Sequence, residues 1–121
     1  MKLEYIHDGD LDTSLIRLYE FDTHGAAELH GLVSDLTGGR RTEVALHGVV
    51  GVAPVDGCQL VLRAGASDEG VVRLGDAFTC VLTPASWGTV VPFCDKADGN
   101  TFQYLDDTGG INLLLSVDGG W

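Results

Sequence analysis

The sequence is poor in the residues that would favour a secreted, membrane-bound or nucleic-acid-binding protein. Its 121 residues include 3 cysteines, 3 prolines and 1 methionine, and only 7% are aromatic. The 7 basic residues stand against 18 acidic ones, which gives a formal net charge of −11. A chain this acidic repels phosphate backbones and anionic lipid surfaces, so we expect neither nucleic acid nor a membrane as its partner.

Long apolar runs are also missing. No segment approaches the roughly 20 apolar residues that a membrane-spanning helix needs. The first residues carry an acid, Glu4, and lack the apolar core of a signal peptide. Cys58, Cys80 and Cys94 are odd in number and lie in apolar surroundings. We therefore predict reduced, buried thiols in a cytoplasmic protein.

Motifs of known chemistry are absent as well. The chain has no Cys-x-x-Cys or His-x-x-x-His pair for a structural zinc ion. It has no Gly-x-Ser-x-Gly, Gly-x-Gly-x-x-Gly or Walker sequence. We predict no cofactor and favour a role without catalysis.

What is present suits a single folded domain over residues 1–121. Hydrophobic residues make up 45% of the chain, and 17 glycines mark many turns. A chain of this length buries its own core.

The most informative stretch is the one around Thr83-Pro84. Residues 77–82 form an apolar, strand-like run. Thr83 is a good N-cap, and proline suits the first helical position because its missing N–H would have no partner there. Trp87, Val90, Val91 and Cys94 then recur at helical spacing. We predict a core strand that leads into a helix packed on the sheet, with a kink at Pro92.

A second helix is predicted between Asp22-Thr23 and Gly38-Gly39, because Leu29, Val33 and Leu36 share one helical face. Strands are predicted at 2–7, 15–21, 42–50, 58–64, 71–74, 77–82, 101–105 and 111–117. The short glycine and aspartate connections between 58 and 82 favour an antiparallel meander. The expected fold is α+β, a mainly antiparallel sheet of about six to eight strands with two helices on one face.

One pattern recurs along the chain. A strand, a threonine-marked turn, a helix and a strand follow each other in residues 15–48 and again in residues 77–105. Residue identity between the two segments is slight, so the pattern alone does not establish a duplication.

Asp8, Asp10 and Asp12 alternate as in the start of an EF-hand loop. Calcium loops of that type place a glycine at position 6 and a glutamate at position 12. Thr13 and Tyr19 occupy those positions here. These carboxylates are candidates for a loose cation site, and a solvated acidic turn is the simpler interpretation.

Cys58 is the best candidate for an exposed thiol, and His47 and Asp56 complete a conceivable nucleophilic set. A buried core cysteine is the simpler interpretation. Ser86, in the first turn of the predicted helix after Thr83, is a candidate for binding an anion.

The last strand is apolar on both faces, which suits a central strand or a subunit contact. Leu113, Leu115 and Trp121 are therefore candidate interface residues. The function we expect first is non-enzymatic contact with a protein partner or a second copy of the chain. The alternative is a small ligand-binding protein or enzyme with a pocket between sheet and helices, which a cavity holding a perturbed cysteine or histidine would support.

Overall fold

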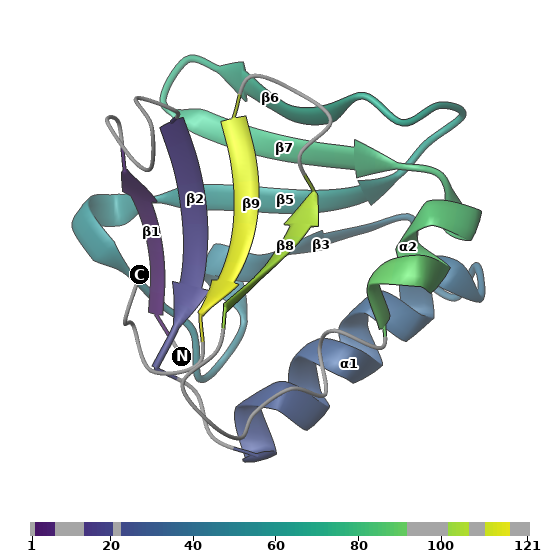
Figure 1. The fold of residues 1–121 in the computed structure, drawn as a ribbon, viewed down its shortest axis with the longest axis horizontal. Helices are drawn as coiled ribbons and strands as arrows, with labels where there is room; N and C mark the ends of the chain where they lie inside the picture. Colours follow the sequence, from purple (N-terminus) through teal and green to yellow (C-terminus); the bar gives the residue numbers. More distant parts are fainter. Residues whose placement is uncertain (1, 7–13, 21–22, 92–101, 107–110, 117–121) are drawn as a thin grey trace.

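The computed structural model describes residues 2–6, 14–20, 23–91, 102–106 and 111–116. In chain order its elements are β1 (Lys2–Ile6), β2 (Ser14–Tyr19), α1 (Thr23–Thr37), β3 (Glu43–Ala45), η2 (Leu46–Gly48), β4 (Ala53–Pro54), η3 (Val55–Gly57), β5 (Gln59–Ala64), β6 (Gly70–Leu74), β7 (Ala77–Leu82), α2 (Pro84–Val90), β8 (Phe102–Asp106) and β9 (Ile111–Ser116) (Figure 1). The two short η elements are 3₁₀ turns.

The strands form two mixed sheets. One has the order β4-β1-β2-β9-β8, in which β4 is only two residues long, and the other has the order β3-β5-β7-β6. In each sheet the two central strands run parallel, β2 with β9 and β5 with β7, and each has an antiparallel strand outside it. The α+β class is confirmed, but the prediction of one mainly antiparallel sheet is wrong.

The predicted meander over residues 58–82 is also wrong. The chain leaves β5, passes the next position in the sheet to form β6 at the edge, and turns back to insert β7 between them. β5 and β7 therefore pair in parallel, with Leu60 opposite Phe78 and Leu62 opposite Cys80.

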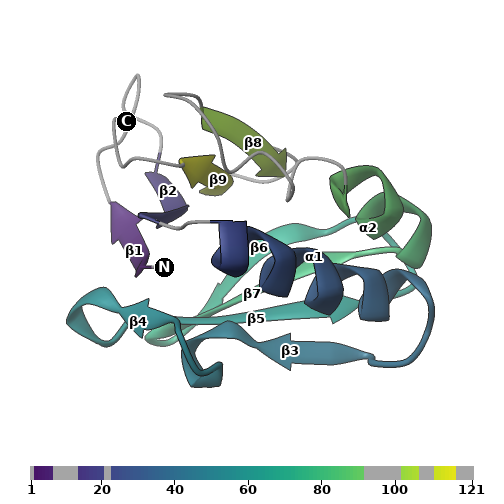
Figure 2. The same ribbon diagram turned by 90° about the horizontal axis from the view of Figure 1, so that it is seen from below.

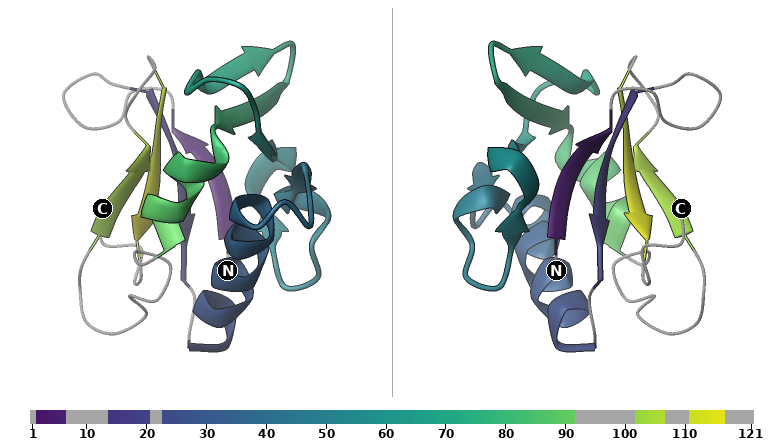
Figure 3. Two further views of the ribbon diagram at one scale, coloured as in Figure 1. Left: turned by 90° about the vertical axis from the view of Figure 1, so that its right-hand side faces the viewer. Right: turned by 90° about the vertical axis from the view of Figure 1, so that its left-hand side faces the viewer.

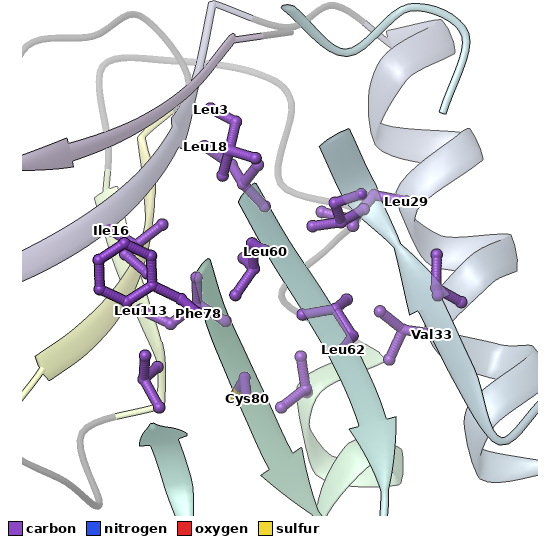
Figure 4. Packing of buried hydrophobic residues seen from close by; sticks show 14 of the residues in the cluster. Leu3, Ile16, Leu18, Leu29, Val33, Leu60, Leu62, Phe78, Cys80 and Leu113 are labelled. Carbon is purple, nitrogen blue, oxygen red and sulfur yellow. The ribbon is translucent and has the colours of Figure 1, made fainter. Parts of the chain in front are cut away.

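The two sheets face each other with their strands running crosswise, and both helices lie together along one open side between them (Figures 1 and 2). Leu60, Leu62, Phe78 and Cys80 point from the second sheet toward Ile16, Leu18 and Leu113 of the first and toward Leu29 and Val33 of α1 (Figure 4). The helices therefore cover the open side between two sheets, whereas the sequence predicts them on one face of a single sheet.

The stretch around Thr83 folds as its sequence predicts. The Thr83 side chain accepts a hydrogen bond from the Ser86 N–H at 3.2 Å, and Pro84 is the first residue of α2. Trp87 is fully buried, and its indole N–H donates to the Arg63 carbonyl at 2.9 Å. The predicted kink at Pro92 and the helical position of Cys94 lie outside the described residues.

The two sheets repeat one topology. β1, β2, α1, β3 and β5 follow each other in the order in which β6, β7, α2, β8 and β9 follow later. Replacing each element by its counterpart turns the order β1-β2-β9-β8 into β6-β7-β5-β3, with every parallel and antiparallel pairing kept. The sequence pattern in residues 15–48 and 77–105 is part of this repeat.

The repeat is broken between β3 and β5. This connection holds η2, β4 and η3 over residues 46–58, whereas residues 107–110 alone separate β8 from β9. The longer connection brings η3 against β1, on the side of the molecule away from α2 (Figures 1 and 3).

Candidate functional site

A hollow of about 540 Å³ opens where the longer connection meets the two sheets. We call it the η3 pocket. Its lining residues are Glu4 and Tyr5 of β1, Val55, Asp56 and Gly57 of η3, Cys58 and Gln59 at the start of β5, and Arg73, Asp76 and Phe78 of the β6–β7 hairpin. Because β5 and β7 are parallel, both begin at this end of the second sheet, and Glu4 and Tyr5 of β1 add residues from the first sheet.

An aromatic pair forms one part of the lining. The rings of Tyr5 and Phe78 lie with their centroids 4.7 Å apart and their planes inclined by 35°. The Arg73 guanidinium carbon lies 5.5 Å from the Tyr5 centroid and 5.4 Å from the Phe78 centroid. The Arg73 Nε–H donates to the Gly75 carbonyl at 3.1 Å, within the hairpin turn. A cation is therefore held over both rings at a distance where cation–π attraction operates.

Acidic side chains form the second part. Glu4, Asp56 and Asp76 all line the η3 pocket. The Oε1 atom of Glu4 accepts a hydrogen bond from Nε of Arg17 at 2.8 Å and forms an ion pair with a terminal nitrogen of the same guanidinium, also at 2.8 Å. The lining itself thus carries three carboxylates against the single guanidinium of Arg73.

The backbone of η3 is unusual at two consecutive positions. Asp56 has φ +53° and Gly57 has φ +71°. Glycine adopts this left-handed conformation freely, and aspartate tolerates it better than most residues, at a cost of roughly 1–2 kcal/mol. Conformations of this kind gather at binding and catalytic sites, and here one of them belongs to a pocket carboxylate.

Cys58 lines the pocket with only 7% of its surface exposed. Burial, and to a smaller extent the Glu4 carboxylate, raise the pKa of the Cys58 thiol to about 11. The side chain is consequently a neutral thiol near pH 7 and a poor nucleophile. The exposed thiol considered from the sequence is instead a buried one.

The structure brings two of the three members of the Cys58, His47 and Asp56 set into one pocket. His47 is not among the lining residues. Its Nδ1 atom accepts a hydrogen bond from the Leu60 N–H at 3.1 Å, which fixes the imidazole on the backbone of β5. His47 therefore does not lie in the pocket as a base for the Cys58 thiol.

The structure describes the predicted interface only in part and the predicted cation site not at all. Asp8, Asp10 and Asp12 lie outside the described residues, and within the described part no three His, Cys, Asp or Glu side chains group as metal ligands would. Leu113 is fully buried in the core of its own chain. The side chain of Leu115 and all of Trp121 lie outside what the structure describes, so an interface there stays a prediction.

The anion site considered at Ser86 is filled by the chain itself. The Asp68 carboxylate accepts hydrogen bonds from the Ser86 hydroxyl at 2.7 Å and from the Thr83 N–H at 2.9 Å. These donors lower the pKa of Asp68, which therefore stays ionised at the start of α2. Thr83, Ser86 and Asp68 therefore cap the N-terminus of α2.

Of the ten lining residues, sequence reasoning singled out Asp56 and Cys58 and missed the other eight, among them Tyr5, Arg73 and Phe78. The one usable signal was Arg73, which shares its strand face with the buried Val71 and so places a cation on the inner side of β6. The contacts of its guanidinium depend on pairing between strands distant in sequence.

No helix among the described residues is both long and apolar enough to span a bilayer. The chain matches no protein-family model, no curated protein and no solved structure at a significant level.

Proposed function

We propose that this chain is a binding protein that holds a small molecule in the η3 pocket without covalent chemistry. The observation that carries the proposal is the position of the pocket on the connection that breaks the repeat. Two sheets of equivalent topology need no such connection for their pairing, since residues 107–110 suffice between β8 and β9. The extra residues supply Val55, Asp56, Gly57 and Cys58 to the pocket.

The size and chemistry of the η3 pocket suit a ligand. Its volume of about 540 Å³ lies within the range of roughly 300–1,000 Å³ found for small-molecule sites. Such sites combine apolar and aromatic walls with a few polar groups, as Tyr5 and Phe78 do here with the carboxylates. Binding is favoured over catalysis because the buried thiol is neutral and His47 is held elsewhere.

A ligand screen with two matched variants tests this proposal. We expect fragments from a library of mixed charge to raise the melting temperature, by about 5 °C for a fragment present at ten times its Kd. Gln59→Trp, at a lining residue, should abolish the shift because the indole fills the pocket. Val50→Trp, at a side chain that is 91% exposed and outside the lining, should preserve it.

The proposal fails if no fragment shifts the melting temperature, or if Gln59→Trp responds as the wild type does. A stable dimer in light scattering would then favour the other expectation, contact with a second copy. The exposed side chains of Val72 and Leu74 on the edge strand β6 are the described feature that favours such contact. Arg73 opposes it, because a charged side chain pointing inward on an edge strand hinders pairing with another chain.

A further inference from the structure

The guanidinium of Arg73 lies over the rings of Tyr5 and Phe78, a position that the cation of a ligand can take in its place. It lies at nearly equal distances from the Tyr5 and Phe78 centroids, 5.5 and 5.4 Å. Its hydrogen bond runs to Gly75, two residues along the chain. Arg73 is an exposed residue on an edge strand, so its side chain is able to swing away without disturbing the core.

The charges around the pair favour a positive occupant. Glu4, Asp56 and Asp76 outnumber Arg73 in the lining, and Arg17 pairs with Glu4 from outside it. With Arg73 displaced toward solvent, the lining keeps the two aromatic rings and three carboxylates, of which Glu4 is paired with Arg17. The whole chain has a formal net charge of −11. Both the pocket lining and the chain as a whole would therefore repel an anionic ligand.

We infer that the ligand of the η3 pocket carries a compact organic cation, an alkylammonium or guanidinium group, which replaces Arg73 over the rings of Tyr5 and Phe78. The inference rests on the proposed function and names its ligand class. Arg73 then acts as an internal competitor that occupies the cation position while the pocket is empty. Aromatic faces are a common means by which proteins bind such cations, and nearby carboxylates add charge attraction.

Titration calorimetry with choline, agmatine and 3,3-dimethylbutan-1-ol tests the inference. The alcohol matches choline in shape and lacks its charge. We expect both cations to bind and the alcohol to bind at least tenfold more weakly than choline. Arg73→Ala should tighten choline binding about fivefold, because it removes the competing cation–π contact. Tyr5→Leu should weaken choline binding, because it removes one ring.

Arg63→Ala is the matched control for charge. Arg63 lies outside the lining and pairs with Glu43 at 3.3 Å, so its removal changes the net charge equally and leaves the aromatic pair intact. We expect choline affinity within twofold of the wild type. The inference is overturned if the alcohol binds as tightly as choline, or if Arg73→Ala fails to tighten choline binding.

The two proposals fail separately. If neutral or anionic fragments bind in the pocket and neither choline nor agmatine displaces them, the cation inference is wrong and the binding function stands. If no fragment of any charge binds, both are wrong.

Discussion

Cys58 illustrates how the surroundings of a single residue decide its chemistry. Its position after Asp56-Gly57 predicts an exposed thiol, yet it is a buried residue in the lining of the η3 pocket. Burial disfavours the thiolate because a charge loses its hydration there, and the Glu4 carboxylate adds repulsion. The same residue in an open loop would be far more reactive.

Alkylation by iodoacetamide, read for each cysteine by peptide mass spectrometry, should show this effect. A pKa of about 11 in place of 9.0 lowers the thiolate fraction at pH 7.4 about 100-fold. We therefore expect Cys58 to react at least about 100-fold more slowly than a free thiol at pH 7.4, with a rate that rises steadily toward pH 11. Glu4→Gln should increase the rate, and Glu43→Gln, a distant change of equal charge, should not. A plateau below pH 9 would contradict the assigned pKa.

Only part of the site was predictable residue by residue. Asp56 and Cys58 were recognised together because only Gly57 separates them in the sequence. Tyr5 and Phe78 meet because β1 and β7 lie in sheets that face each other, and local pattern does not encode which sheets face. Side chains brought together by long-range pairing leave no common signal in a single sequence.

At the scale of elements, α2 shows how a short helix is held. Seven residues are too few for a helix to persist by propensity alone. Thr83 caps its first turn, and Asp68 accepts hydrogen bonds from Thr83 and Ser86. Trp87 and Val90 then bury its inner face.

Thr83→Ala should lower the free energy of unfolding by about 1 kcal/mol, because the Ser86 N–H loses its acceptor. Urea denaturation at pH 7 measures this, with Thr42→Ala, at an exposed threonine outside the helices, as the control. Equal stability of Thr83→Ala and the wild type would show that the cap is dispensable.

The pKa of Asp68 is lowered below 3.8 by its hydrogen bonds to the Thr83 N–H and the Ser86 hydroxyl. Its contribution to the free energy of unfolding is therefore present above pH 3.8 and is lost as the pH falls through the pKa of the folded state. Asp68→Asn should therefore be less stable than the wild type at pH 7 and should approach it in strong acid.

Elements were predictable where local chemistry determines them, as at Thr83-Pro84, and their pairing was not. The meander over residues 58–82 was inferred from short connections. Yet residues 65–69 can span about 17 Å, and two strand spacings need only about 10 Å. The loop is therefore long enough to skip one position, so its length did not decide between a meander and the observed order.

At the scale of the whole molecule, the two halves are interlocked. β3 and β5 of the first half complete the sheet of β6 and β7, and β8 and β9 of the second half complete the sheet of β1 and β2. Each half therefore needs the other to complete both sheets, and one core contains buried residues from both halves, including the two helices.

A chain divided between Ala66 and Ser67 tests this arrangement. Both residues are exposed in the loop between β5 and β6. We expect residues 1–66 and 67–121 to be unfolded when produced separately and to assemble into one folded particle when produced together. Circular dichroism and size-exclusion chromatography measure both states. A division after Gly31, within α1, is the control and should not reassemble as well.

A cooperative melting transition of residues 1–66 alone would contradict the interlocked arrangement. That fragment would then be stable without β9, the parallel neighbour of β2 in the complete chain.

The parallel pairing of β2 with β9 also bears on when this protein acquires its shape during synthesis. Ser14 lies opposite Ile111, so the first sheet waits for a strand made nearly a hundred residues later. While the ribosome is still translating, the edge of β2 that later pairs with β9 has no partner. The nascent chain therefore carries an unpaired strand edge through most of its synthesis, the stage at which molecular chaperones protect it from aggregation.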